Sequence, residues 1–230
     1  MCLQVLRGEA FIILGPSGQG KTTLLKTMAG LIEPQQGEVF VDSMNLFATN
    51  DTTRHSPVGK MGMLFQRNAL FDSMTCLENI EFSLREAGAR SHEDIRTTAT
   101  FFLEAVGLSH AANLFPDEIS GGMQKRLGIA RALALRPQIV FYDDPTAGLD
   151  PITARKIVDL ILDMQKSHGS TVVAVTNDMA RAYQLGTRFG FLFNGELLIT
   201  GDKEQTLQSA DPRVQQFIHG LVEGPLDTVE

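Results

Sequence analysis

The sequence predicts an α/β fold in which a mostly parallel sheet carries helices on its faces. Two observations support this prediction. Short apolar runs alternate along the chain with longer segments of helical periodicity. A Gly-x-x-x-x-Gly-Lys-Thr pattern joins the first apolar run to the first helical segment. With 230 residues and 43% apolar content, the chain can form one domain with its own core, or such a core with a smaller inserted lobe.

The first part of the chain reads as strand, loop and helix. Residues 11–14 are an apolar run cut off by a Gly-Pro pair, which is typical of a buried parallel strand. Residues 21–29 place their apolar side chains on one side, and Gly30 can adopt the left-handed conformation that ends helices. Residues 58–70 are strand-like and then irregular. These segments are expected to open the sheet.

The middle of the chain is predicted to be helical. Residues 76–87 and 91–106 read as helices, which a turn at Gly88 separates. Residues 119–135 read as a third helix, with Ser120 as its N-cap and a proline just beyond its end. We therefore expect an inserted helical lobe.

The second half returns to alternating strands and helices. Pro151 suits the first turn of a helix, and the pair Asn194-Gly195 tolerates the positive φ angles of a type I′ hairpin turn. The expected elements are strand 139–142, helix 151–167, strand 171–176, a hairpin with strands 189–193 and 196–200, and helix 214–221.

The charge and cysteine content limit the compartment and the partners. A formal net charge of −7 argues against the basic face that a nucleic-acid binder needs, so no nucleic-acid partner is expected. Charges interrupt every apolar stretch before the roughly 18 residues of a spanning helix, and the amino end lacks the order of a secretory signal. Cys2 and Cys76 are too few for a disulfide framework. A cytoplasmic protein is expected.

The glycine-rich pattern predicts a phosphate-binding loop. Glycines let backbone N–H groups turn toward a phosphate, and the following helix adds the partial positive charge of its amino terminus. Lys21 would neutralise phosphate oxygens, and Thr22 would offer a hydroxyl to Mg²⁺. An ordinary glycine-rich turn is the alternative, which the position between a strand and a helix disfavours. The expected nucleotide contacts are Gly15, Pro16, Ser17, Gly18, Gln19, Gly20, Lys21, Thr22 and Thr23.

Two carboxylates follow a second buried strand. Asp143 comes after four apolar residues, so the strand would deliver it rigidly to the magnesium of the loop. Asp144 lies where a carboxylate could accept a proton from the attacking water. The alternative is that the pair caps the region that follows, and the phosphate loop upstream makes this the weaker interpretation.

Further motifs resemble those of ABC ATPases. The segment 119–124, Ile-Ser-Gly-Gly-Met-Gln, resembles the family signature LSGGQ; Gln66 falls at its glutamine loop, and residues 147–150 look like its D-loop. The resemblance implies that the signature closes on a nucleotide held by a second copy of the chain. It assigns hydrolysis to Lys21, Gln66, Asp144 and Asn177, metal binding to Thr22, Gln66 and Asp143, and further nucleotide contacts to Gln66, Asp143, Ser120, Gly121, Gly122, Gln124 and Asp150.

The family fold also implies how the chain is divided. It would form a P-loop NTPase core of ABC type as a single domain over 1–230. Its expected parts are the nucleotide-binding core 1–70 and 136–205, the helical subdomain 71–135, and a C-terminal helical extension 206–230. The edge of the lobe near residues 66–79 is expected to receive a helix of a membrane permease.

Three departures from the family pattern bear on catalysis. The family usually has glutamate where this chain has Asp144, whose carboxylate is one methylene shorter. It usually has histidine where this chain has Asn177, which can donate a hydrogen bond but cannot carry a proton or positive charge. We therefore expect intact ATP binding and reduced turnover. The phosphate loop also begins only 15 residues in, so either the start site is misplaced or the amino-terminal strands are truncated, and no aromatic residue is assigned to adenine.

The subgroup indicated by residues 63–72, 102–108 and 211–225 is the set of ATPases that power MCE-type lipid transporters. That resemblance implies a pair of ATPase subunits on the cytoplasmic face of the inner membrane, docked on a permease, with a periplasmic MCE lipid-binding partner and phospholipid as cargo. Three alternatives stay open: an importer of polar solutes such as amino acids, a nucleotide-gated subunit with little hydrolysis, and a soluble ABC protein acting on ribosomes or DNA. The last fits the acidic charge poorly.

Overall fold

The computed structural model describes residues 1–47, 57–88 and 91–226. A six-stranded sheet lies at its centre, in the order β4-β5-β6-β1-β7-β8. Its strands are β1 (Ala10–Leu14), β4 (Met61–Leu64), β5 (Ile139–Asp143), β6 (Thr171–Val175), β7 (Arg188–Phe193) and β8 (Glu196–Gly201). All neighbouring pairs are parallel except β7 and β8. The predicted mostly parallel α/β fold is confirmed.

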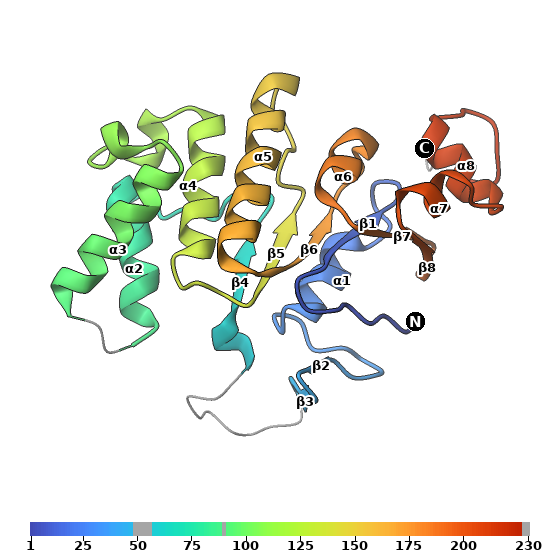
Figure 1. Ribbon diagram of the computed structural model, residues 1–230, viewed down its shortest axis with the longest axis horizontal. Coiled ribbons are helices and arrows are strands. Elements are labelled where there is room, and N and C mark those ends of the chain that lie inside the picture. The colour runs from blue at the N-terminus through green and yellow to red at the C-terminus, as the bar shows by residue number, and fades with distance from the viewer. Residues whose placement is uncertain (48–56, 89–90, 227–230) are drawn as a thin grey trace.

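Helices cover both faces of this sheet (Figure 1). They are α1 (Lys21–Met28), α2 (Cys76–Glu86), α3 (His92–Ala105), α4 (Gly121–Leu133), α5 (Pro151–His168), α6 (Met179–Leu185), α7 (Lys203–Leu207) and α8 (Pro212–His219). Short 3-10 turns cover Pro57–Lys60, Ser109–Ala111 and Pro116–Glu118, and a separate two-stranded ribbon joins β2 (Phe40–Val41) to β3 (Met44–Asn45). No helix in the described part of the chain is both long and apolar enough to cross a membrane.

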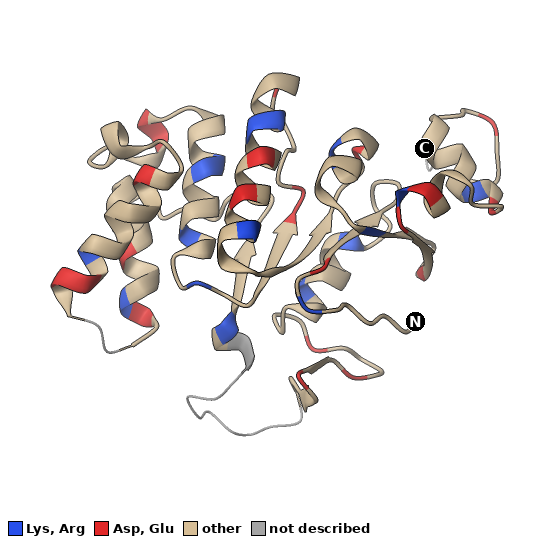
Figure 2. Ribbon diagram, viewed as in Figure 1, with Lys and Arg blue, Asp and Glu red and all other residues tan. Residues whose placement is uncertain are grey.

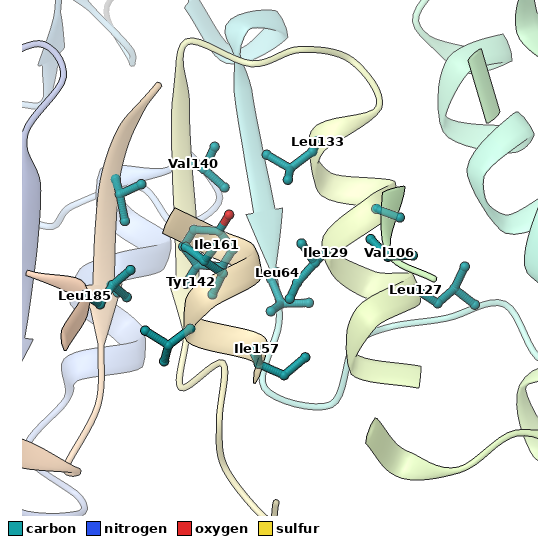
Figure 3. Packing of buried hydrophobic residues seen from close by; sticks show 14 of the residues in the cluster. Leu64, Val106, Leu127, Ile129, Leu133, Val140, Tyr142, Ile157, Ile161 and Leu185 are labelled. Atoms are coloured by element: carbon teal, nitrogen blue, oxygen red, sulfur yellow. The ribbon is translucent and has the colours of Figure 1, made fainter. Parts of the chain in front are cut away.

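Two apolar clusters, one on each face, hold the sheet. Phe11 and Ile13 of β1 pack with Leu25 of α1, and alternate residues of the same strand join the larger cluster on the other face. In Figure 3 the larger cluster brings Leu64 of β4 and Tyr142 of β5 against side chains of α4 and α5. Because both faces are covered, the strands are apolar throughout, as the sequence pattern predicts.

Helices α2, α3 and α4 pack on one another and lie together at the β4 edge of the sheet (Figure 1). Helix α4 also packs directly on β4. Glycines allow this close approach: a side chain on Gly62 would collide with the Ala132 carbonyl, and one on Gly128 with Leu64. The helix that follows the signature motif is therefore shared between the lobe and the sheet.

Several elements differ from their sequence-based expectations. Helix α8 begins earlier and ends earlier than residues 214–221, because Asp211 caps it, Pro212 opens it and Gly220 adopts φ 61°. Helices α6 and α7 and the β2–β3 ribbon were not expected, since each is too short to show a period. Asn194 and Gly195 take φ angles of 48° and 80°, which confirms the predicted hairpin turn. Residues 48–56 and 89–90, and residues 227–230 of the expected extension, lie outside the described residues.

Candidate nucleotide-binding site

The expected phosphate loop joins β1 directly to α1. Its backbone requires glycine: Gly18 and Gly20 have φ angles of 79° and 87°, and a side chain on Gly15 would collide with the carbonyl oxygen of Leu192 in β7. The loop is also braced by the β7–β8 turn, because the backbone N–H of Asn194 donates to Gln19 Oε1 at 2.6 Å. The residues from Gly15 to Thr23 therefore form a fixed cradle at the amino end of α1.

Lys21 turns its ammonium group back onto this loop. Its Nζ donates to the carbonyl oxygens of Gly15 and Pro16, both at 2.7 Å. Burial lowers the pKa of Lys21, and the negative charges of Asp144 and Asp143 oppose that shift. An incoming anion would offer the ammonium group stronger partners than two neutral carbonyls. In this arrangement the Lys21 ammonium group can exchange its two carbonyl partners for phosphate oxygens.

Asp143 and Thr22 come from distant parts of the chain and meet at the loop. Thr22 Oγ1 donates to Asp143 Oδ1 at 2.8 Å, and Asp143 is buried at the carboxyl end of β5. A hydroxyl and a carboxylate beside a phosphate loop are oxygen donors that Mg²⁺ accepts together with nucleotide phosphates. Within the described residues, no group of three or more His, Cys, Asp or Glu side chains is placed to hold a metal. These two oxygen donors thus fit a magnesium ion whose remaining ligands come from a nucleotide.

Asp144 adopts an unusual backbone conformation beside this pair. Its φ is 46°, in the left-handed region that a non-glycine residue rarely enters, and its N–H donates to the carbonyl oxygen of Val175 at 2.9 Å. Thr176 Oγ1 donates to Asp144 Oδ1 at 3.0 Å. Burial raises the pKa of Asp144, while the Thr176 hydrogen bond and the charge of Lys125 act in the opposite direction. The Asp144 carboxylate is therefore hydrogen-bonded to Thr176, the residue that follows β6.

Gln66 and Asn177 are both exposed at the same edge of the sheet. Gln66 follows β4, and Asn177 follows the buried Thr176 at the end of β6. Because β4, β5 and β6 are parallel neighbours, these residues leave the sheet on either side of Asp144. The structure thus places Gln66, Asp144 and Asn177 at the carboxyl edge of the sheet, where the loop that carries Lys21 also leaves β1.

Lys125 was missed by the sequence analysis. It lies on α4, is only 3% exposed, and its Nζ donates to the carbonyl oxygen of Gln66 at 2.8 Å. Its position was readable as a pattern, because Lys125 shares the i, i+4 and i+7 spacing of one helical face with Ile129 and Ala132, which are both buried. A lysine on the buried face of a helix is a rare feature.

The signature residues lie apart from the phosphate loop. Ser120 caps α4, with its Oγ accepting from the Met123 N–H at 3.3 Å, and Gln124 turns back so that Nε2 donates to the Pro116 carbonyl at 2.7 Å. Ser120, Gly121 and Gly122 line a pocket of about 480 Å³ with Gly148 to Asp150 and the first turns of α5. No phosphate-loop residue is among the described residues that line it.

Asp150 forms the other wall of this signature pocket. Its Oδ1 accepts from the backbone N–H groups of Ile152 and Thr153 at 3.0 and 3.1 Å, which caps α5. The Thr153 side chain and then these backbone groups lower the pKa of the Asp150 carboxyl group. Gln124 and Asp150 thus form hydrogen bonds with nearby backbone groups, whereas Ser120 and Gly121 remain exposed. The pocket offers the exposed Ser120 and Gly121 and two basic side chains, those of Arg126 and Lys156.

The fold, the phosphate loop and the signature motif define an ATP-binding cassette, and the chain belongs to the ABC transporter family, whose model matches residues 1–147. The expected family membership and the expected ATPase activity are thereby confirmed: the chain is an ABC ATPase. The intermembrane phospholipid transport system ATP-binding protein MlaF of Escherichia coli (strain K12) is 38% identical over 224 residues, which are 97% of this chain and 83% of MlaF.

A second sequence relative and a solved structure also match most of the chain. The "Probable ribonucleotide transport ATP-binding protein mkl" of Mycobacterium leprae (strain TN) is 37% identical over 228 residues, 99% of this chain and 66% of that protein. A solved structure of the ATP-binding cassette MJ0796, a dimeric post-hydrolysis state bound to ADP and Pi, matches with a TM-score of 0.77 at 38% identity and covers 85% of each chain.

Proposed function

We propose that this chain is the ATPase subunit of a phospholipid transporter, in which two copies act as a dimer on a membrane permease. The similarity to MlaF over 97% of the chain carries the proposal for the cargo. The dimeric state of the MJ0796 cassette supports the proposal for the assembly. Docking on a permease would place the subunit at the cytoplasmic face of the inner membrane, with a periplasmic MCE protein as a further partner.

Nucleotide binding is assigned to the loop from Gly15 to Thr23. Backbone N–H groups at the start of α1 and the Lys21 ammonium would hold the β- and γ-phosphates, with Lys21 leaving its two loop carbonyls to do so. Thr22, Asp143 and Gln66 are proposed to hold Mg²⁺, which supplies positive charge against the phosphate oxygens. The 2.8 Å contact between Thr22 and Asp143 is the observation that supports this assignment.

Asp144 and Asn177 are proposed to act on the attacking water. Asp144 would accept its proton, and Asn177 would donate a hydrogen bond to the γ-phosphate. In the present geometry one Asp144 oxygen is engaged by Thr176, and the side chain is short, so turnover is expected to be low. This observation also favours a second candidate, a subunit that binds ATP as a gate and cleaves it slowly.

The signature pocket is assigned to the nucleotide of a second copy. Ser120, Gly121 and Gly122 are proposed to cap its γ-phosphate, because their pocket contains no part of the chain's own phosphate loop among the described residues. Gln124 and Asp150 are proposed to support this contact by shaping the loop ends, as their local hydrogen bonds indicate.

The division of the chain is proposed on the same basis. Residues 1–70 and 136–205 would form the nucleotide-binding core, 71–135 the helical subdomain, and 206–230 the extension. The mutual packing of α2, α3 and α4 supports a lobe, while the packing of α4 on β4 gives that lobe a firm attachment to the core.

The cargo is tested by coexpressing the chain with its proposed membrane permease subunits and purifying the complex. Mass spectrometry of the bound small molecules should find phospholipid in stoichiometric amount. A polar solute with no lipid would contradict the proposal and favour an importer. ATP turnover of the same complex in lipid vesicles separates an active pump from a slow nucleotide gate.

Charge distribution supports a protein partner at the lobe rather than nucleic acid. Figure 2 shows acidic and basic residues interspersed along α2, α3 and α5, whereas the charged residues of α4 are all basic. Such a surface gives little counterion release on a nucleic-acid backbone. We therefore propose that the assembly contains no nucleic acid.

A further inference from the structure

Among the described residues, Lys125 is the one lysine or arginine that is almost completely buried, and it contacts Gln66, a residue assigned to hydrolysis. It belongs to α4, the helix that the signature serine caps, and it is only 3% exposed. Removing an ammonium group from water costs several kcal/mol unless charged or hydrogen-bonding partners replace the solvent. Its ammonium group donates a hydrogen bond to a neutral acceptor, the carbonyl oxygen of Gln66, at 2.8 Å. The carboxylates whose charge acts on Lys125 are those of Asp144 and Asp143 at the end of β5.

The sheet register places those carboxylates beside Gln66. Leu64 of β4 is paired with Tyr142 of β5, so Gln66 and Asp144 lie two residues beyond a matched pair of parallel strands. Lys125 reaches this edge from α4, which packs on β4. Burial lowers the pKa of Lys125, and the charges of Asp144 and then Asp143 oppose the shift. The same Lys125 charge opposes the raised pKa of Asp144.

We propose that Lys125 is a positioning residue of the hydrolysis site, whose ammonium group holds the Gln66 backbone against the carboxylate pair at the end of β5. It thereby fixes the distance between two strands at the edge where water and γ-phosphate would meet. The signature helix, the glutamine loop and the catalytic carboxylate are joined through this one side chain. The inference rests on the proposed roles of Asp144 and Gln66.

Arg131 provides a matched control on the same helix. Its guanidinium group donates to the carbonyl oxygens of Asn68 and Ala69, two residues with positive φ angles in the segment that follows Gln66. Burial alone lowers the pKa of Arg131, without a contribution from a carboxylate. Arg131 and Lys125 therefore hold the same segment by backbone carbonyls, but only Lys125 also compensates the charge of Asp144.

The inference is tested by a double-mutant cycle in the nucleotide-free protein. Lys125→Met and Arg131→Met are each made in the wild type and in Asp144→Asn, and urea unfolding midpoints are measured. Lys125→Met should lower the urea midpoint, and this decrease should be at least halved in the Asp144→Asn background. The reason is that Asp144→Asn removes the carboxylate whose charge the Lys125 ammonium group compensates. The loss caused by Arg131→Met should be the same in both backgrounds. Equal losses for Lys125→Met in both backgrounds would overturn the inference.

Two further measurements keep the test decisive. If Lys125→Met does not fold, Lys125→Gln replaces it in the cycle. Lys125→Arg keeps the positive charge, so it should retain at least half of the wild-type difference in unfolding midpoint between the Asp144 and Asp144→Asn backgrounds. In the assembled complex, Lys125→Met should lower turnover per bound nucleotide at least tenfold while ATP affinity changes less than twofold. Because the unfolding cycle needs neither permease nor cargo, its outcome is independent of whether the transported molecule is a lipid.

Discussion

At the scale of single residues, Asp144 is the position where the family pattern and the geometry disagree most. Its left-handed backbone and its hydrogen bond from Thr176 hold a short carboxylate to one side of the phosphate loop. Asn177 next to this threonine offers an amide in place of an imidazole. Both features bear on the proton transfer proposed for this site rather than on the proposed phosphate contacts.

The first prediction concerns the length of this side chain. Asp144→Glu adds one methylene and should raise the turnover of the assembled complex about tenfold, since a well-placed base contributes 10²-fold or more to a hydrolysis rate. ATP affinity should stay unchanged. Asp144→Asn serves as the control and should abolish turnover. Wild-type turnover at ordinary family rates, together with no increase in Asp144→Glu, would show that the shorter carboxylate is already sufficient.

Residues of the site differ in how far the sequence could predict them. The phosphate loop and Asp143 were predictable, because glycine spacing and an apolar run before a carboxylate carry local information. Lys125 was not predicted, since its role depends on the sheet register that places Gln66 beside Asp144. The direction of Gln124 was also beyond the sequence, because its amide turns toward a carbonyl eight residues earlier.

At the scale of elements, the carboxyl-terminal helix α8 is fastened to the hairpin by one arginine. Arg213 Nη2 donates to Asp211 Oδ2 at 2.7 Å, and Nη1 donates to Glu196 Oε2 of β8 at 2.9 Å. Its guanidinium also lies 5.3 Å from the ring centre of Phe193. Hydrogen bonds from Arg213 lower the pKa of Asp211, the residue that caps α8.

The second prediction concerns the ion pair between Arg213 and Asp211. Arg213→Met should reduce the free energy of unfolding by about 1 kcal/mol or less at neutral pH, since the pair is partly exposed to solvent. Because the folded pKa of Asp211 is depressed, the contribution is complete above the unfolded pKa of about 4 and is lost as pH falls through the lower folded value. Thermal unfolding from pH 7 to pH 3 should show the two proteins converging. Arg155→Met, which breaks an exposed pair with Asp159, is the control and should change stability less.

The long elements were predictable because they carry a clear period, whereas the short ones were not. Helix α5 and strands β5 and β6 lie within one or two residues of their expected bounds. Helix α6 has only seven residues, and the strands of the β2–β3 ribbon have two each, so their formation depends on contacts rather than on sequence period. The turn after β4, with consecutive positive φ angles at Asn68 and Ala69, is held by Arg131 from far along the chain.

At the scale of the whole molecule, the arrangement of the two phosphate-facing motifs predicts a head-to-tail dimer. Lys21→Ala should weaken ATP binding at least tenfold, about 1.4 kcal/mol, because the loop loses its ammonium group. Ser120→Arg should block the signature pocket. Each variant alone should be inactive, whereas mixed pairs should regain activity, because one of their two sites combines an intact loop with an intact signature.

This third prediction is measured as ATP turnover of coexpressed, separately tagged variants purified through both tags. If the signature acted within its own chain, every site in a mixed pair would carry one lesion and no activity would return. Equal, negligible affinity of the wild type and Lys21→Ala for magnesium nucleotide would be a deeper contradiction, because it would remove the nucleotide site itself.

The glycine contacts between β4 and α4 have a mechanical consequence. Gly62 of β4 lies directly against the backbone carbonyl of Ala132 in α4, while Gly128 of α4 lies against the Leu64 side chain of β4. A push applied to the outer helices of the lobe therefore has a stiff path into the sheet, and little of the displacement can be absorbed on the way. Enlarging Gly62 to alanine would force β4 and α4 apart and would weaken the mechanical connection between these helices and the sheet.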